Sequence, residues 1–183
     1  EFVTAGGVSA NYIARWNGSD WSAVANSLNP QHLDQCPVNS LAFVGNDLYV
    51  GGNFFITVGP WDYICFARWN GTAWSGEGYG FMGWDYYTTV YTVCAHGNDV
   101  YAGGYFEYNS GVYLRNLGMW DGTQWNQVGA DAGIGMDRYV NDMAVMGNDL
   151  WIAGRFEHAG KKKANYIASW DGTQWTEPGQ GTG

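Results

Sequence analysis

The chain has 183 residues, a net charge of −9 and only eight Lys and Arg residues. This basic content is too small for the electrostatic footprint of a nucleic-acid-binding protein. No apolar run approaches the ~20 residues that a helix needs to cross a bilayer, so membrane insertion is not expected. Twenty-eight glycines and 17% aromatic residues favour an all-β protein with many turns.

The first predicted strand pair surrounds a six-residue tryptophan motif at positions 16–21. The motif returns three times, and eight of the eleven tryptophans lie in the four copies. The repeat therefore decides where most of the large apolar surface lies. The three later copies are residues 69–74, 120–125 and 170–175.

An Asn-Gly or Asp-Gly pair between two hydrophobic runs predicts a tight β-hairpin. A two-residue loop at Asn17 and Gly18 would place Trp16 opposite Ser19 and Ala14 opposite Trp21. Both tryptophans would then lie on one face of the hairpin. In this register the residue opposite the second tryptophan would be small in every copy: Ala14, Ala67, Gly118 or Ala168.

A second motif contains Gly-Asn-Asp and occurs at 45–52, 97–104 and 147–154. It predicts a turn between a first strand, such as 41–44, and a second strand, such as 48–54. The paired glycines at the end of the motif indicate close backbone approach. Corresponding first strands are expected at 93–96 and 143–146.

Four strands in a unit of about 50 residues are typical of β-propeller blades. We therefore predict an all-β fold, a β-propeller built of four-stranded blades, with about three and a half repeats in a single array over 1–183. The first strand pair would leave an open edge that recruits another strand. The repeat units are approximately 2–53, 54–105, 106–155 and a partial unit at 156–183.

Residues 11–21 and 45–54 resemble the repeats of bacterial and fungal cell-surface propellers, which are similar to the kelch and galactose-oxidase-type superfamily. The resemblance covers nearly the whole chain and carries no catalytic motif. It implies an extracellular or cell-surface propeller.

Function on such a scaffold is expected in its variable connections. The connections after the second strand are predicted as loops at about 55–63, 107–114 and 157–165, and those after the fourth strand at about 24–39, 76–91 and 127–141. Aromatic rings beside carboxylates can bind sugars or anchor a protein partner, and they can also simply cover the blade tops. The candidate contact residues are Trp61, Asp62, Tyr63, Phe81, Trp84, Asp85, Tyr86 and Tyr108.

Asn17 and Asn70 match the acceptor pattern for N-glycosylation, although the turn alone also explains an asparagine there. Cys94 is predicted to be a small core residue, while Cys36 and Cys65 could form a disulfide. The three histidines have no metal-ligand spacing, and no cofactor or metal is expected.

We therefore expect a non-catalytic extracellular propeller scaffold that self-associates with further copies into a structural or adhesive assembly. One alternative is a lectin-like propeller that binds glycans. Another is a fragment of a larger propeller enzyme.

Overall fold

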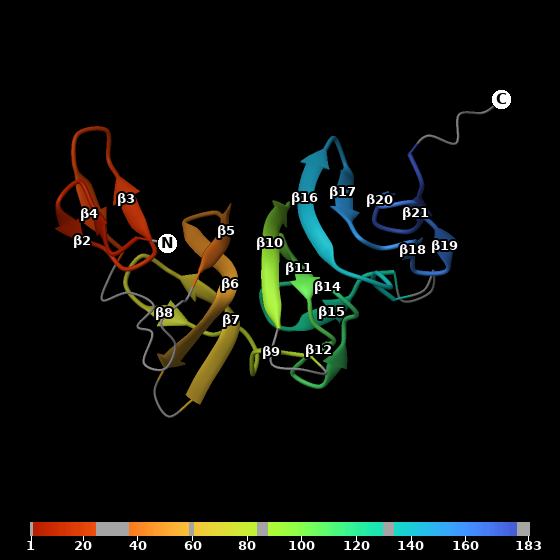
Figure 1. The fold of residues 1–183 in the computed structure, drawn as a ribbon, viewed down its shortest axis with the longest axis horizontal. Coiled ribbons are helices and arrows are strands. Elements are labelled where there is room, and N and C mark those ends of the chain that lie inside the picture. The colour runs from red at the N-terminus through yellow and green to blue at the C-terminus, as the bar shows by residue number, and fades with distance from the viewer. Residues whose placement is uncertain (1, 25–36, 59–60, 84–87, 130–133, 179–183) are drawn as a thin grey trace.

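The computed structural model describes residues 2–24, 37–58, 61–83, 88–129 and 134–178. Their regular structure is entirely β, and no helix occurs in these ranges (Figure 1). Every strand pairing is antiparallel, which confirms the predicted all-β class.

Three four-stranded sheets form the body of the protein, and each takes its strands in chain order (Figure 1). They correspond to the three predicted sets of four strands. A fourth unit near the N-terminus is a two-stranded hairpin. The sheets contain β5 (Val38–Val44), β6 (Asp47–Val58), β7 (Trp61–Trp69) and β8 (Trp74–Ser75); β10 (Thr89–His96), β11 (Asp99–Tyr105), β14 (Leu117–Trp120) and β15 (Trp125–Gln127); β16 (Val140–Met146), β17 (Asp149–Gly154), β20 (Ile167–Trp170) and β21 (Trp175–Thr176); the hairpin contains β3 (Ala14–Trp16) and β4 (Trp21–Ala23).

The first and second strands of each sheet are joined by a two-residue Gly-Asn turn. Gly45, Gly97 and Gly147 have φ values of 59°, 64° and 66°. The asparagines that follow them have no positive φ, which is the pattern of a type II′ turn with glycine at its first central position. The Gly-Asn-Asp motif therefore forms the predicted hairpins.

The tryptophan hairpins differ from the prediction in register. Trp16 lies directly opposite Trp21, so the loop contains four residues, 17–20, and not two. The side-chain oxygen of Asn17 accepts hydrogen bonds from the backbone N–H groups of Ser19 and Asp20, both at 2.8 Å. This bonding stabilises the wider loop, in which only Gly18 needs a positive φ. The prediction that both indoles share one face is confirmed.

The connections between second and third strands were predicted as loops, and this was wrong. Two of them form short hairpins, and the other extends β6 and β7 through the pairs Phe55–Ile64 to Val58–Trp61. A further short hairpin precedes β3. The added strands are β1 (Thr4–Ala5), β2 (Val8–Ser9), β12 (Tyr108–Asn109), β13 (Val112–Tyr113), β18 (His158–Ala159) and β19 (Lys162–Lys163), with β9 (Phe81–Met82) paired to β12.

The residue four positions before the first tryptophan of the motif has a left-handed backbone in every repeat. Tyr12, Cys65, Asn116 and Tyr166 have φ values of 64°, 68°, 67° and 71°. Of these residue types, only asparagine commonly adopts such a conformation. The residue types at this position therefore did not predict the shared backbone conformation.

The sheets pack face to face in chain order and form an open row (Figure 1). One core cluster fills the space between the sheets of β5–β8 and β10–β15, and another lies between the latter and the sheet of β16–β21. A Cβ added to Gly51 would lie 2.5 Å from Cγ1 of Val90 in the next sheet. The expectation that the paired glycines permit close approach is thus confirmed.

Candidate functional site

The predicted aromatic contact residues do not form one exposed group in the described part of the chain. Phe81 is only 1% exposed and packs against Phe66, Phe106 and Trp125, with ring centroids 4.3 to 6.0 Å away. It therefore belongs to the core and not to a surface that a partner could reach. Tyr108 is partly exposed and lies beside Tyr113, with the ring centroids 5.1 Å apart.

The remaining candidate contact residues divide into two groups. Trp61, Asp62 and Tyr63 lie on β7 and pair with Val58, Thr57 and Ile56 of β6. Trp84, Asp85 and Tyr86 lie outside the described residues. The prediction of a glycan-binding face is therefore supported by the sequence pattern alone.

The two glycosylation candidates, Asn17 and Asn70, lie at exposed hairpin tips. Their side-chain oxygens accept the backbone N–H groups of the second and third residues that follow. Asp121 and Asp171 make the same contacts in the other two copies. These asparagines thus have a complete structural role in the turn, and the structure leaves their modification as a prediction.

The aspartates at these tips have altered acidities. A hydrogen bond from the Thr173 hydroxyl, together with backbone N–H donors, lowers the pKa of Asp171 to about 2. The corresponding hydroxyl of Thr123 and its neighbouring donors also lower the pKa of Asp121. Both carboxylates are therefore tuned to hold their loops and not to transfer protons at neutral pH.

Comparison of equivalent positions reveals two unpartnered surfaces at the ends of the row of sheets. At the C-terminal end, Ile167 is 39% exposed, although its counterparts Leu117 and Phe66 are 0% and 1% exposed. The inner residues are covered by the following sheet, whereas no described sheet follows β16–β21. We call this the outer face, and it comprises Asp142, Ala144, Met146, Trp151, Ala153 and Ile167.

The outer face contains a shallow hollow and an unsatisfied polar atom. The hollow has a volume of about 110 Å³ and lies over β16, β17 and β20. The indole nitrogen of Trp151 is buried and has no hydrogen-bond partner. Met146, at the edge of this face, is 63% exposed. Exposed apolar side chains beside a hollow are typical of an interaction surface.

At the N-terminal end, the indoles of the first hairpin lie in the open. Trp16 and Trp21 are 51% and 41% exposed, whereas Trp120 and Trp125 are 5% and 3% exposed. The ring pairs have similar geometry, with centroids 5.3 and 5.7 Å apart. The difference is that the inner pair packs against the preceding sheet, where Phe66 lies 5.0 Å from Trp125.

A groove lies between this first hairpin and the sheet of β5–β8, beside the core cluster in which Ile13 packs with Leu48 and Val50. Its volume is about 600 Å³, and its lining is largely apolar. We call it the hairpin groove. It is bordered by Ile13, Ala14, Arg15, Trp16 and Val24 on one side, and by Leu41, Phe43, Leu48 and Trp69 on the other.

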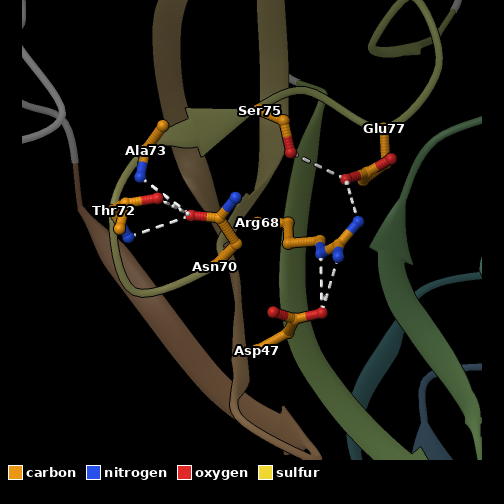
Figure 2. A network of polar contacts seen from close by, with 7 residues as sticks. All are labelled: Asp47, Arg68, Asn70, Thr72, Ala73, Ser75 and Glu77. Atoms are coloured by element: carbon orange, nitrogen blue, oxygen red, sulfur yellow. Dashed lines mark hydrogen bonds and ion pairs between the residues drawn. The ribbon is translucent and has the colours of Figure 1, made fainter.

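An ion-pair network links the strands of the sheet of β5–β8 (Figure 2). Arg68 on β7 approaches Asp47, which begins β6, with 2.6 Å between Nη2 and Oδ2. Its Nη1 lies 3.6 Å from Oε1 of Glu77, which also accepts a hydrogen bond from the Ser75 hydroxyl at 2.8 Å. The arginine thus ties the second strand of the repeat to the third and fourth.

The described cysteines show no sign of nucleophilic chemistry. Cys65 and Cys94 are both free, so Cys65 does not form the disulfide considered with Cys36, which lies outside the described residues. Burial raises the pKa of Cys65 to about 12. Cys94 is half-buried and packs against the core, which confirms its prediction as a small core residue.

The described ranges contain no group of three or more His, Cys, Asp or Glu side chains that could hold a metal ion. They also contain no helix long and apolar enough to span a membrane. Comparison with known proteins finds no matching family model and no matching curated relative.

The important surface residues were missed by sequence reasoning. Ile167, Met146, Leu41 and Arg15 occupy repeat positions that are ordinary core or edge positions elsewhere. The available signal in the sequence was the first strand pair, which lacks two of the four strands of a full unit. It predicted an open edge but did not identify the side chains around that edge.

Proposed function

We propose that the chain is a non-catalytic, β-propeller-type scaffold that associates head to tail with further copies into a structural assembly. The outer face of one copy would pack on the exposed tryptophans of the first hairpin of the next. The observation that carries the proposal is that Ile167 and Trp16 are exposed at the two ends, whereas their inner counterparts Leu117 and Trp120 are buried.

The inner junctions supply the geometry for this contact. Between the first two full sheets, Tyr49 and Phe66 pack in the same cluster as Trp120 and Trp125. Trp151 and Ile167 are the counterparts of Tyr49 and Phe66 on the outer face. The surfaces at the two ends are therefore of the kinds that already pack together inside the molecule.

A junction of this type joins two different surfaces. When two copies join, each copy therefore still has one unused surface that can bind a further copy. Such contacts form a ring if the rotation closes and a filament if it does not. We further propose an extracellular or cell-surface location and a propeller geometry for the completed assembly. These two points rest on the repeat pattern and its resemblance to surface propellers of the kelch type.

Association can be tested by light scattering and sedimentation velocity at about 1 to 100 μM, the range in which moderate protein interfaces form. We expect larger species for the unmodified chain and monomers for Met146→Asp, because a carboxylate would be buried in the junction. Met82→Asp is the matched control, since Met82 is also exposed but lies on β9 and not on either end surface.

A mixing experiment tests the head-to-tail arrangement itself. Trp16→Asp blocks one end and Met146→Asp blocks the other, so each variant should be monomeric alone. Their mixture should form a 1:1 complex, because one good surface of each type remains. An unmodified chain that stays monomeric throughout, or variants that fail to complement each other, would refute the proposal.

A further inference from the structure

The third strand of the first unit lacks a neighbour that its counterparts have. Within the described residues, β3 pairs only with β4, whereas β7, β14 and β20 pair on both edges. In all three full sheets the additional neighbour is the second strand of a Gly-Asn hairpin. The vacant edge of β3 therefore corresponds to one specific missing element.

The hairpin groove lies where that element would be. Leu41, on the far wall of the groove, is 49% exposed, while its counterparts Val93 and Met143 are 5% and 7% exposed. Val93 shares its core cluster with Ala42, Val44 and Tyr49, which come from the first two strands of the preceding sheet. The first unit has no described strands in those positions, so Leu41 remains uncovered.

A charged residue also lacks the partner that its counterpart has. Arg15 precedes Arg68 by one repeat and occupies the same place before the tryptophan motif. Arg68 binds the aspartate of the Gly-Asn-Asp turn on its neighbouring strand (Figure 2). In the described part of the chain, the ion pairs do not include Arg15, which is exposed beside the groove.

We propose that the hairpin groove binds a two-stranded hairpin of this repeat's own chemistry, with its Gly-Asn-Asp aspartate paired to Arg15. The second strand of the bound hairpin adds to the edge of β3, and the residues facing β5 cover Leu41. The three full sheets provide the model for these contacts. The inference depends on the proposed scaffold role in taking a repeat as the partner, but it concerns the groove between β3 and β5, which shares only Trp16 with the head-to-tail junction.

The probe is a synthetic peptide with the sequence of residues 140–155, which contains the Gly-Asn-Asp turn of β16 and β17. It is titrated by calorimetry into the Met146→Asp chain, so that association through the outer face does not interfere. We expect saturable 1:1 binding and slower amide hydrogen exchange at residues 14–16. Leu41→Asp should weaken binding by at least about tenfold, because it places a charge against the bound hairpin.

The ion pair is tested by a double-mutant cycle. Arg15→Met in the chain and Asp149→Asn in the peptide should each weaken binding by about threefold to tenfold, and combining them should add little. Arg138→Met is the matched control, because Arg138 is exposed on a different connection. The peptide should bind the chain that carries Arg138→Met as tightly as it binds the Met146→Asp chain without this substitution.

Several results would overturn the inference. These are an absence of peptide binding to the folded chain, binding that Leu41→Asp leaves unchanged, or additive effects of Arg15→Met and Asp149→Asn. If the chain dimerises and the amides of residues 14–16 are protected from exchange before any peptide is added, the groove is instead assigned to a second copy. The Met146→Asp background prevents the chain from assembling through its own outer face. The peptide also carries residues of that face, so binding to the exposed tryptophans is distinguished by Leu41→Asp, which changes the groove alone.

Discussion

Gly103 on β11 lies directly against Val140 at the start of β16. A Cβ on this glycine would come within 2.5 Å of Cγ1 of Val140 and 3.2 Å of Cγ2 of Thr92. The missing side chain thus lets two neighbouring sheets approach each other. The equivalent residue in the last sheet is Ala153, which lies on the outer face where no described sheet follows. This repeat position therefore carries a methyl group in the last sheet, against which no described sheet packs.

Gly103→Ala is expected to destabilise the protein by roughly 1–3 kcal/mol, because the added methyl group overpacks the contact between sheets. Ala153→Gly is the reciprocal control and should change the free energy of unfolding by about 1 kcal/mol or less. Urea unfolding followed by tryptophan fluorescence measures both. Equal effects of the two substitutions would contradict the assignment of Gly103 to a crowded junction.

The repeat pattern predicted the strands and the crowding at the glycines because both depend on residues within one unit. It failed at the tryptophan turn, where the Asn17 side chain satisfies two backbone donors and so stabilises a four-residue loop. It also failed at the end surfaces. Whether Leu41 is covered depends on which sheet lies beside it, and a repeat position alone cannot specify that.

Tyr166 has the left-handed backbone shared by its repeat position, with φ at 71°, and its side chain is largely exposed. This conformation is unfavourable for a tyrosine, whereas Asn116 shows that asparagine serves at the same position. We expect Tyr166→Asn to raise stability by about 0.5–1 kcal/mol. Tyr91→Asn is the control, since Tyr91 has no positive φ and should gain nothing. Thermal unfolding of the two variants provides the test.

Acid is expected to destabilise the hairpin tips and the connection before β16. Hydrogen bonds hold the folded-state pKa of Asp121 and Asp171 below the ordinary value, and the latter falls to about 2. Burial opposes the same change at Asp137, but donors from His158 and Glu157 still lower its pKa. Since these pKa values are depressed on folding, the stabilisation is present above about pH 4 and is lost as the pH falls towards 2.

The aspartate effect can be isolated with a substitution that the repeat already contains. Asp171→Asn copies the residue found at Asn17 and Asn70, and its side-chain oxygen can accept the same two backbone N–H groups. The variant should therefore show a shallower loss of stability between pH 4 and pH 2, in denaturation curves measured across that range. An unchanged slope would show that Asp171 does not contribute to the acid sensitivity.

Cys65 should resist alkylation in the folded protein. It is completely buried, its thiol lies 3.3 Å from the carbonyl oxygen of Thr88, and burial raises its pKa to about 12. Because only the thiolate reacts rapidly, iodoacetamide at pH 8 should modify Cys65 only after unfolding. Mass spectrometry of digested protein, treated with and without guanidinium, measures this directly. Rapid labelling of Cys65 without denaturant would mean that the core between β7 and the segment at Thr88 opens readily. The close packing proposed for the scaffold would then be wrong at that junction.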